Sequence, residues 1–242
     1  YKPYSQNWED EDKQLTREES KSFGANLLWR NPYIEEIREL SRSGNLDFNK
    51  KVIGTFQLLK QKFSWNGEYK LYSENLDKVL KTGTGSNADL NFIFIGMLKS
   101  FGIKAYPVVM SRRSAGMLPV SFPSLQKLNT FVVAIYDEVK GKYVYLDGSM
   151  DIPALNVLPV ELSVTKARIL SADIPENKKW VNLQEIPTNQ IFMKISANAQ
   201  GSQITGRRTT ILKGHDALGY RKEYQTKDSL VNKQELVKEK LA

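Results

Sequence analysis

The opening part of the chain carries apolar residues at the spacing of a helix. In "DFNKKVIGTFQLLKQKFSW" the apolar positions recur three or four residues apart, with Lys and Gln between them: Phe48, Val52, Phe56, Leu59 and Phe63. This pattern predicts an amphipathic helix capped by Asp47. Shorter helices are expected over residues 33–40, where Pro32 fits the first turn, and over residues 74–82, with Ser73 as N-cap.

A second helical stretch is apolar on nearly every side. "TGTGSNADLNFIFIGMLKSFG" runs from a turn of Gly, Ser and Thr into a long apolar segment. Ser86 is placed to cap a helix over residues 86–101, with Asp89 three residues on as its capping-box partner. Gly102 is expected to end the helix in the left-handed conformation. A helix of this composition belongs in the middle of a domain.

After Gly102 the apolar period changes from 3.6 to 2. Strands are predicted over residues 105–112, 130–138 and 142–148, and the last two form a hairpin across Lys140 and Gly141. The proline-containing segment 114–128 between the first two strands is of the kind that borders a cleft. A helical first half followed by an antiparallel sheet predicts an α+β domain, with its sheet starting at about residue 103.

The remainder of the chain is irregular and rich in proline until residue 190. Residues 190–212 alternate around a Gly-containing turn and predict a β-hairpin, and residues 229–242 predict a polar terminal helix. We therefore expect a first domain over residues 1–170 and a β-rich extension over residues 171–242 that continues beyond this chain.

Charge and composition restrict the classes of function. The chain has 242 residues, 40% of them apolar, and a net charge of +8. Its Lys and Arg are scattered among Asp and Glu, which argues for a solvated surface and against a nucleic-acid face. No segment approaches the roughly 20 consecutive apolar residues of a transmembrane helix. The chain starts at Tyr1 without a signal-peptide pattern, and we expect that a preceding segment has been removed.

The scarcity of Cys and His removes several chemistries. With no Cys and one His, disulfides, thiolate metal sites and cysteine nucleophiles are excluded, and any Ser–His pair would have to use His215. Neither a Walker-type nor a dinucleotide glycine motif is present. No metal and no cofactor are expected.

Two segments resemble the transglutaminase-like superfamily, which has the papain-like cysteine peptidase fold. "GSNADLNFIFIGMLKSFGIKAYPVVMSRR" is similar to the G-x-C-x-D-x-x-x-L-L-x-x-M-L-x-x-x-G-I-x-A-x-P-V core of these domains in multidomain secreted bacterial proteins. The positions in register are Gly85, Asp89, Met97, Leu98, Gly102, Ile103, Ala105, Pro107 and Val108. "NTFVVAIYDEVKGKYVYLDGS" resembles the strand pair that carries the family's catalytic His and Asp. The resemblance covers residues 45–159.

The resemblance implies a domain that has lost its catalytic residues. The family's nucleophilic Cys falls on Asn87 and its His on Thr130, so that only Asp147 remains of the triad. The leading hypothesis is an inactive transglutaminase-like domain of a larger secreted protein, periplasmic or extracellular, whose cleft binds a protein, peptide or glycan. The residues expected to line that cleft are Trp65, Ser86, Asn87, Asn129, Thr130 and Asp147.

Two alternatives of other classes stay open. The chain could be an active hydrolase or acyltransferase with Ser86 as nucleophile, although a hydroxyl needs a base and nothing in the sequence brings His215 to it. It could also be a purely structural or assembly module. Arg112 and Arg113 are read as solvated charges with the capacity to bind a carboxylate or phosphate, and Trp180 as a core residue. An open space around Asn87 would favour a binding or catalytic role, and a filled space would favour a structural one.

Overall fold

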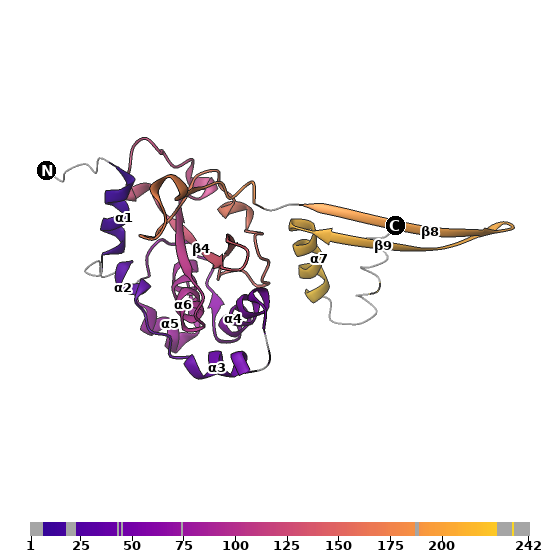
Figure 1. The fold of residues 1–242 in the computed structure, drawn as a ribbon, viewed down its shortest axis with the longest axis horizontal. Helices are drawn as coiled ribbons and strands as arrows, with labels where there is room; N and C mark the ends of the chain where they lie inside the picture. The colour runs from indigo at the N-terminus through magenta and orange to yellow at the C-terminus, as the bar shows by residue number, and fades with distance from the viewer. Residues whose placement is uncertain are drawn as a thin grey trace. The chain divides into compact units, whose positions relative to one another are not determined.

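The computed structural model describes residues 7–17, 23–42, 44, 46–73, 75–186, 189–226 and 234. The chain divides into two compact units, residues 1–185 and residues 186–242, and each has elements of its own (Figure 1). None of the helices among these described residues is long and apolar enough to cross a membrane.

The first half of the first unit is helical, as predicted. Its helices are α1 (Trp8–Thr16), α2 (Gly24–Leu27), α3 (Ile34–Arg42), α4 (Phe48–Lys62), α5 (Leu76–Thr82) and α6 (Asn87–Ser100). The predicted cap of α4 is confirmed, because the Asp47 carboxylate accepts from the Lys50 N–H at 2.8 Å. The predicted cap of α5 is wrong. Asn75, directly before the helix, accepts from the Lys78 N–H, whereas Ser73 lies two residues further from the helix.

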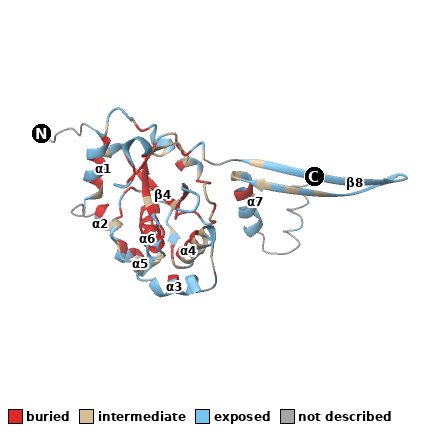
Figure 2. Ribbon diagram, viewed as in Figure 1, coloured by how far each residue is buried: buried red, intermediate tan, exposed pale blue. Residues whose placement is uncertain are grey.

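Helix α6 is the centre of the unit. Its capping box is formed, since the Ser86 hydroxyl accepts from the Asp89 N–H while the Asp89 carboxylate accepts from the Ser86 N–H at 2.8 Å. Every residue from Asn87 to Leu98 is buried (Figure 2). Gly102 has φ 78°, the left-handed conformation predicted for the end of this helix. The expectation of a buried central helix is confirmed.

The sheet that packs on α6 is antiparallel and has five strands in the order β5-β4-β3-β6-β7. The strands are β3 (Ala105–Met110), β4 (Thr130–Asp137), β5 (Lys142–Leu146), β6 (Ala167–Ile169) and β7 (Trp180–Val181). The three predicted strands are present, each one or two residues shorter at its C-terminal end. A short parallel pair, β1 (Ser64–Trp65) and β2 (Thr84–Gly85), leads into α6. The domain is therefore α+β.

Strands β6 and β7 shift the expected domain boundary. β7 pairs with β6 inside the main sheet, so the first unit continues to Glu185 and does not end at residue 170. The two strands have three and two residues, too few to show a period of 2 in the sequence.

A buried ion cluster attaches α1 to this end of the sheet. The Arg168 side chain has no exposed surface and donates to both oxygens of Asp12, at 2.7 Å each, and to both oxygens of Glu176. Lys179 donates to Asp12 at 3.1 Å. The Arg168 guanidinium also lies over the ring of Trp180, which is therefore part of this packing. Residues 156 positions apart in sequence are joined here.

The second unit contains a long β-hairpin and a helix. The predicted hairpin is confirmed as β8 (Gln190–Gln200) and β9 (Gln203–Lys213), paired along their whole length. Almost every residue of both strands is exposed. The helix α7 (His215–Thr226) was not predicted, because Gly219 interrupts a stretch with few apolar residues. The predicted terminal helix over residues 229–242 lies outside the described residues, except for Gln234.

Candidate functional site

Asn87 is positioned by the turn that starts α6. Its own N–H donates to the Glu68 carbonyl at 3.1 Å, while β1 and β2 hold the preceding residues in register. Gly85 is required two residues earlier, since a Cβ there would lie 2.9 Å from both the Asp89 and Val79 side chains. The N-terminus of a central helix is therefore fixed at the position that the resemblance assigns to a nucleophile.

The Asn87 amide is fully bonded inside the protein. Its nitrogen donates to the Thr130 hydroxyl at 2.6 Å and to the Phe131 carbonyl at 3.3 Å, and its oxygen accepts from the Lys70 N–H at 2.7 Å. Both Asn87 and Thr130 have 0% of their surface exposed. The two positions to which the resemblance assigns the family's Cys and His are therefore in direct contact.

Asp147 joins the same cluster through Asn91. The Asn91 nitrogen donates to the Phe131 carbonyl at 2.7 Å and to Asp147 Oδ1 at 2.9 Å, so Phe131 is shared with Asn87. The Asn91 oxygen accepts from the Gly148 N–H at 2.7 Å, and the Ser149 hydroxyl donates to Asp147 Oδ2. Burial raises the pKa of Asp147 above the usual aspartate value, opposed by the bonds from Ser149 and Asn91.

The Ser86 hydroxyl is not positioned to attack a substrate that approaches from solvent. Its side chain is 2% exposed, and its hydroxyl donates to Asp89 Oδ2 at 2.7 Å within the capping box. His215, the first residue of α7, belongs to the second unit.

The predicted cleft is closed at its centre. Ser86, Asn87, Thr130 and Asp147 are buried and do not line an open space, contrary to expectation. Of the flanking positions, Trp65 is half-buried and donates to the Glu68 carbonyl, and Asn129 is half-buried and accepts from the Arg112 N–H at 2.9 Å. At the positions that the resemblance assigns to the family's catalytic residues, the amide of Asn87, the hydroxyl of Thr130 and the carboxylate of Asp147 are thus buried and hydrogen-bonded within the protein.

Two residues of this region, Asn91 and Lys60, were not predicted from the sequence to belong to the site. Asn91 lies one helical turn after Asn87, and two amides four residues apart on an apolar helix are a signal that could have been read. Lys60 of α4 gives no such signal. Burial lowers the pKa of Lys60, opposed by the charges of Asp151 and Asp147, and its Nζ has no hydrogen-bond partner in the described part of the chain.

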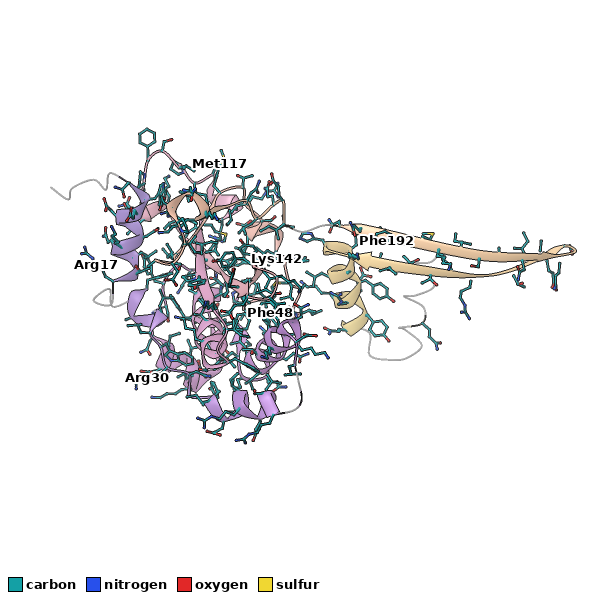
Figure 3. The ribbon with its side chains drawn as sticks, viewed as in Figure 1. Arg17, Arg30, Phe48, Met117, Lys142 and Phe192 are labelled. Carbon is teal, nitrogen blue, oxygen red and sulfur yellow. The ribbon has the colours of Figure 1, made fainter. Side chains whose placement is uncertain are left out.

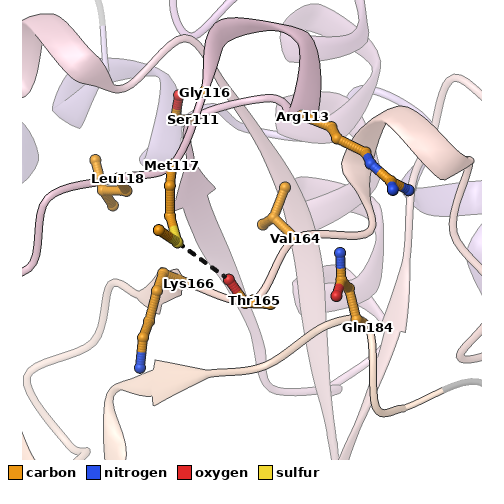
Figure 4. Close-up of a pocket in the computed structure, with 9 residues that line it drawn as sticks. All are labelled: Ser111, Arg113, Gly116, Met117, Leu118, Val164, Thr165, Lys166 and Gln184. Atoms are coloured by element: carbon orange, nitrogen blue, oxygen red, sulfur yellow. Dashed lines mark hydrogen bonds between the residues drawn. The ribbon is translucent and has the colours of Figure 1, made fainter.

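An open pocket of about 300 Å³ lies where β3 ends and β6 begins (Figure 4). Its lining comes from the end of β3 and the turn after it, from the segment that enters β6, and from the segment after β7: Ser111, Arg113, Gly116, Met117, Leu118, Val164, Thr165, Lys166 and Gln184. None of the six residues expected to line the binding cleft is among them, but Gly116, Met117 and Leu118 belong to the segment 114–128, which was expected to border a cleft. Met117 stands at the outer surface of the first unit, 78% exposed (Figure 3).

The twin arginines after β3 have different surroundings. Arg112 is half-buried, with its guanidinium 5.4 Å from the centre of the Tyr69 ring. Burial, with the charges of Asp147 and Glu161, raises the pKa of Tyr69 to about 12. Arg113 is exposed at the pocket. Only Arg113 is therefore placed to meet a ligand from solvent.

Comparisons with known proteins give little more. No protein-family model matches the chain, and no curated protein matches it. Among solved structures, the crystal structure of a putative protease from Parabacteroides distasonis ATCC 8503 is similar, with a TM-score of 0.45 and 13% sequence identity. The match covers 78% of this chain and 51% of that one, so this chain spans about half the length of its structural neighbour. A likeness of this degree carries no conclusion about function.

Proposed function

We propose that this chain is a catalytically inactive transglutaminase-like domain of a larger secreted or periplasmic protein, and that it binds a protein, peptide or glycan. The hydrogen bond from the Asn87 amide to the Thr130 hydroxyl, with both side chains fully buried, carries this proposal. An amide is not a nucleophile, and a threonine hydroxyl is not a general base at neutral pH. The motif around α6 supports the family, and the pocket supports a binding role.

The geometry weighs against Ser86 as an alternative nucleophile. Its hydroxyl is committed to the capping box with Asp89, and a substrate carbonyl would reach it only if the first turn of α6 opened. A purely structural module has one observation in its favour, because the closed cluster ties α6 to β4 and to the end of β5. The pocket, which such a module would not need, favours binding.

Thiol labelling tests whether the site is closed. Because the chain has no Cys, Asn87→Cys gives a single thiol whose labelling rate by iodoacetamide under native conditions measures access to that position. Met117→Cys is the matched control at an exposed position of the same unit. We expect Asn87→Cys to be labelled roughly a hundredfold or more slowly, since reaction requires local opening. Equal labelling rates in the folded variants would show an open cleft.

Turnover assays test the absence of catalysis. We expect no transglutaminase, amidase or peptidase activity from the unmodified chain, and little from Asn87→Cys combined with Thr130→His, because the site excludes substrate. A serine-directed probe is the direct test of the alternative. Labelling that is lost in Ser86→Ala but kept in Ser100→Ala would establish the hydrolase or acyltransferase and overturn the proposal.

A further inference from the structure

The pocket where β3 ends and β6 begins combines positive charge with an apolar floor. Its two cations, Arg113 and Lys166, have no carboxylate oxygen within ion-pair distance in the described residues, and no Asp or Glu lines the pocket. Figure 4 shows Arg113 and Gln184 on one side of the pocket and Lys166 on the other. Leu118 and Val164, which also line the pocket, are buried. Such a site favours an anionic group that is attached to an apolar one.

We propose that this pocket binds the C-terminal carboxylate of a peptide or protein whose last residue is aliphatic. The proposal rests on the binding role proposed above and supplies its ligand class. Each feature of such a chain end has a counterpart in the lining. Arg113 is placed to bind the carboxylate, while Lys166 adds positive charge on the opposite side. Leu118 and Val164 can contact an aliphatic side chain, and the Gln184 oxygen can accept from a peptide N–H.

Arg113 is held in place to meet a carboxylate. It is the first residue of the short 3-10 helix η1 (Arg113–Ala115), and Glu161 secures this turn by accepting from the N–H of Ser114 at 3.1 Å and from its hydroxyl. The Ser114 hydroxyl and the charges of Arg112 and Arg113 lower the pKa of Glu161. Both bonds go to Oε1 of Glu161, and no carboxylate oxygen of the described residues lies within ion-pair distance of Arg113. Its guanidinium fork is therefore available for a ligand carboxylate, which it can bind with two hydrogen bonds.

The polar wall has a free acceptor for a peptide group. The Gln184 nitrogen donates to the Ser163 carbonyl at 3.1 Å, which fixes the orientation of the amide. Its oxygen accepts no hydrogen bond from the residues that the structure describes. Figure 4 shows the amide nitrogen on the side of Arg113 and the oxygen turned away from it. The oxygen is therefore available to a peptide N–H further along the bound chain.

The apolar floor of the pocket favours the end of a peptide over small inorganic anions. Leu118, Val164 and the rim residue Met117 offer contact to an aliphatic side chain, and the lining contains no aromatic ring on which a sugar could stack. Inorganic phosphate would pair with the cations but leave these apolar side chains uncovered. An aliphatic C-terminus satisfies both halves of the pocket.

Matched peptides test the inference on the full chain. Fluorescence anisotropy would compare the labelled pentapeptide Gly-Gly-Ser-Ala-Leu as free acid, the same peptide as C-terminal amide, and a version that ends in Gly. The charge variant is Arg113→Gln with Lys166→Gln. Its control, Lys194→Gln with Arg207→Gln, removes the same charge from exposed positions of the second unit.

The free acid is expected to bind best. Amidation and the charge variant should each weaken binding roughly tenfold or more, and the Gly terminus roughly tenfold, while the control leaves binding unchanged. Equal binding of acid and amide, an equal loss in the control, or displacement by inorganic phosphate below the peptide concentration needed for half-saturation would each overturn the inference. So would failure of the free acid to bind at millimolar concentration. Labelling of Asn87→Cys and the turnover assays do not depend on binding at the pocket, and would still test the proposed closure and inactivity.

Discussion

Asp12→Ala is expected to lower the free energy of unfolding of the first unit by about 3–5 kcal/mol. The substitution removes two charge-assisted hydrogen bonds of 2.7 Å from Arg168, whose side chain is 0% exposed, and the 3.1 Å bond from Lys179. Each such bond is worth about 1.5–3 kcal/mol. Glu176 remains as a partner, but its side chain is 51% exposed and compensates only in part. The free energy of unfolding falls because the buried Arg168 guanidinium keeps too little negative charge around it.

Tryptophan fluorescence during urea unfolding measures this loss in the right unit. All four tryptophans, at positions 8, 29, 65 and 180, precede residue 186, so the signal reports the first unit alone. Glu9→Ala is the control on the same helix, because the Glu9–Lys13 pair has side chains 54% and 62% exposed. It should cost less than about 1 kcal/mol.

A second variant separates charge burial from packing. Asp12→Leu combined with Arg168→Met replaces both buried partners with apolar groups, and should recover much of the lost stability because no uncompensated charge remains. Glu176 and Lys179 can still pair with each other across 3.7 Å. The reasoning is refuted if Asp12→Ala costs no more than the Glu9→Ala control, or if the double variant is as unstable as the single one.

Three further outcomes follow from the closed cluster and α6. Asn87→Ala should destabilise the first unit by about 1–3 kcal/mol, since the buried Thr130 hydroxyl loses its donor and the Lys70 N–H loses its acceptor, and a urea midpoint equal to that of the unmodified chain would contradict this. The raised pKa of Asp147 stabilises the folded state below the ordinary aspartate pKa, and this contribution is lost as pH rises through the folded pKa. Asp147→Asn should therefore make the unfolding free energy depend less on pH from about pH 4 upward, measured by urea unfolding across that range. Gly96→Ala would place a Cβ 2.6 Å from the Trp29 ring, so we expect a loss of about 1–3 kcal/mol and a shifted emission spectrum; an unchanged spectrum would show that the ring does not move.

Local signals explain the parts of the fold that the sequence predicted correctly. The capping box of Ser86 and Asp89 and the left-handed Gly102 involve residues within a few positions of each other, so their sequence pattern contains the whole interaction. The cap of α5 shows the limit. Ser73 and Asn75 are both good cap residues, and the exact start of the helix decides between them.

Long-range contacts explain what the sequence did not reveal. Arg168 reads as an exposed residue of a weak strand, and its complete burial depends on Asp12, 156 positions earlier. The closure of the predicted cleft depends likewise on partners of the Asn87 amide 43 and 44 positions away. A family motif predicts where such side chains meet, but not whether a space is left between them.

The hairpin of β8 and β9 has a consequence for the behaviour of the protein in concentrated solution. In the part of the chain that the structure describes, neither of its strands of eleven residues pairs with a third strand, and its exposed apolar side chains include Ile191, Ile195 and Ile204. Edges of this kind promote pairing between molecules. The hairpin carries Lys and Arg but no Asp or Glu, so copies repel one another at low ionic strength. Salt shortens the range of that repulsion, from roughly 10 Å at 0.1 M to 3 Å at 1 M, and leaves the apolar attraction in place. The colloidal stability of the chain should therefore fall as salt is added, the reverse of a protein whose association rests on ion pairs.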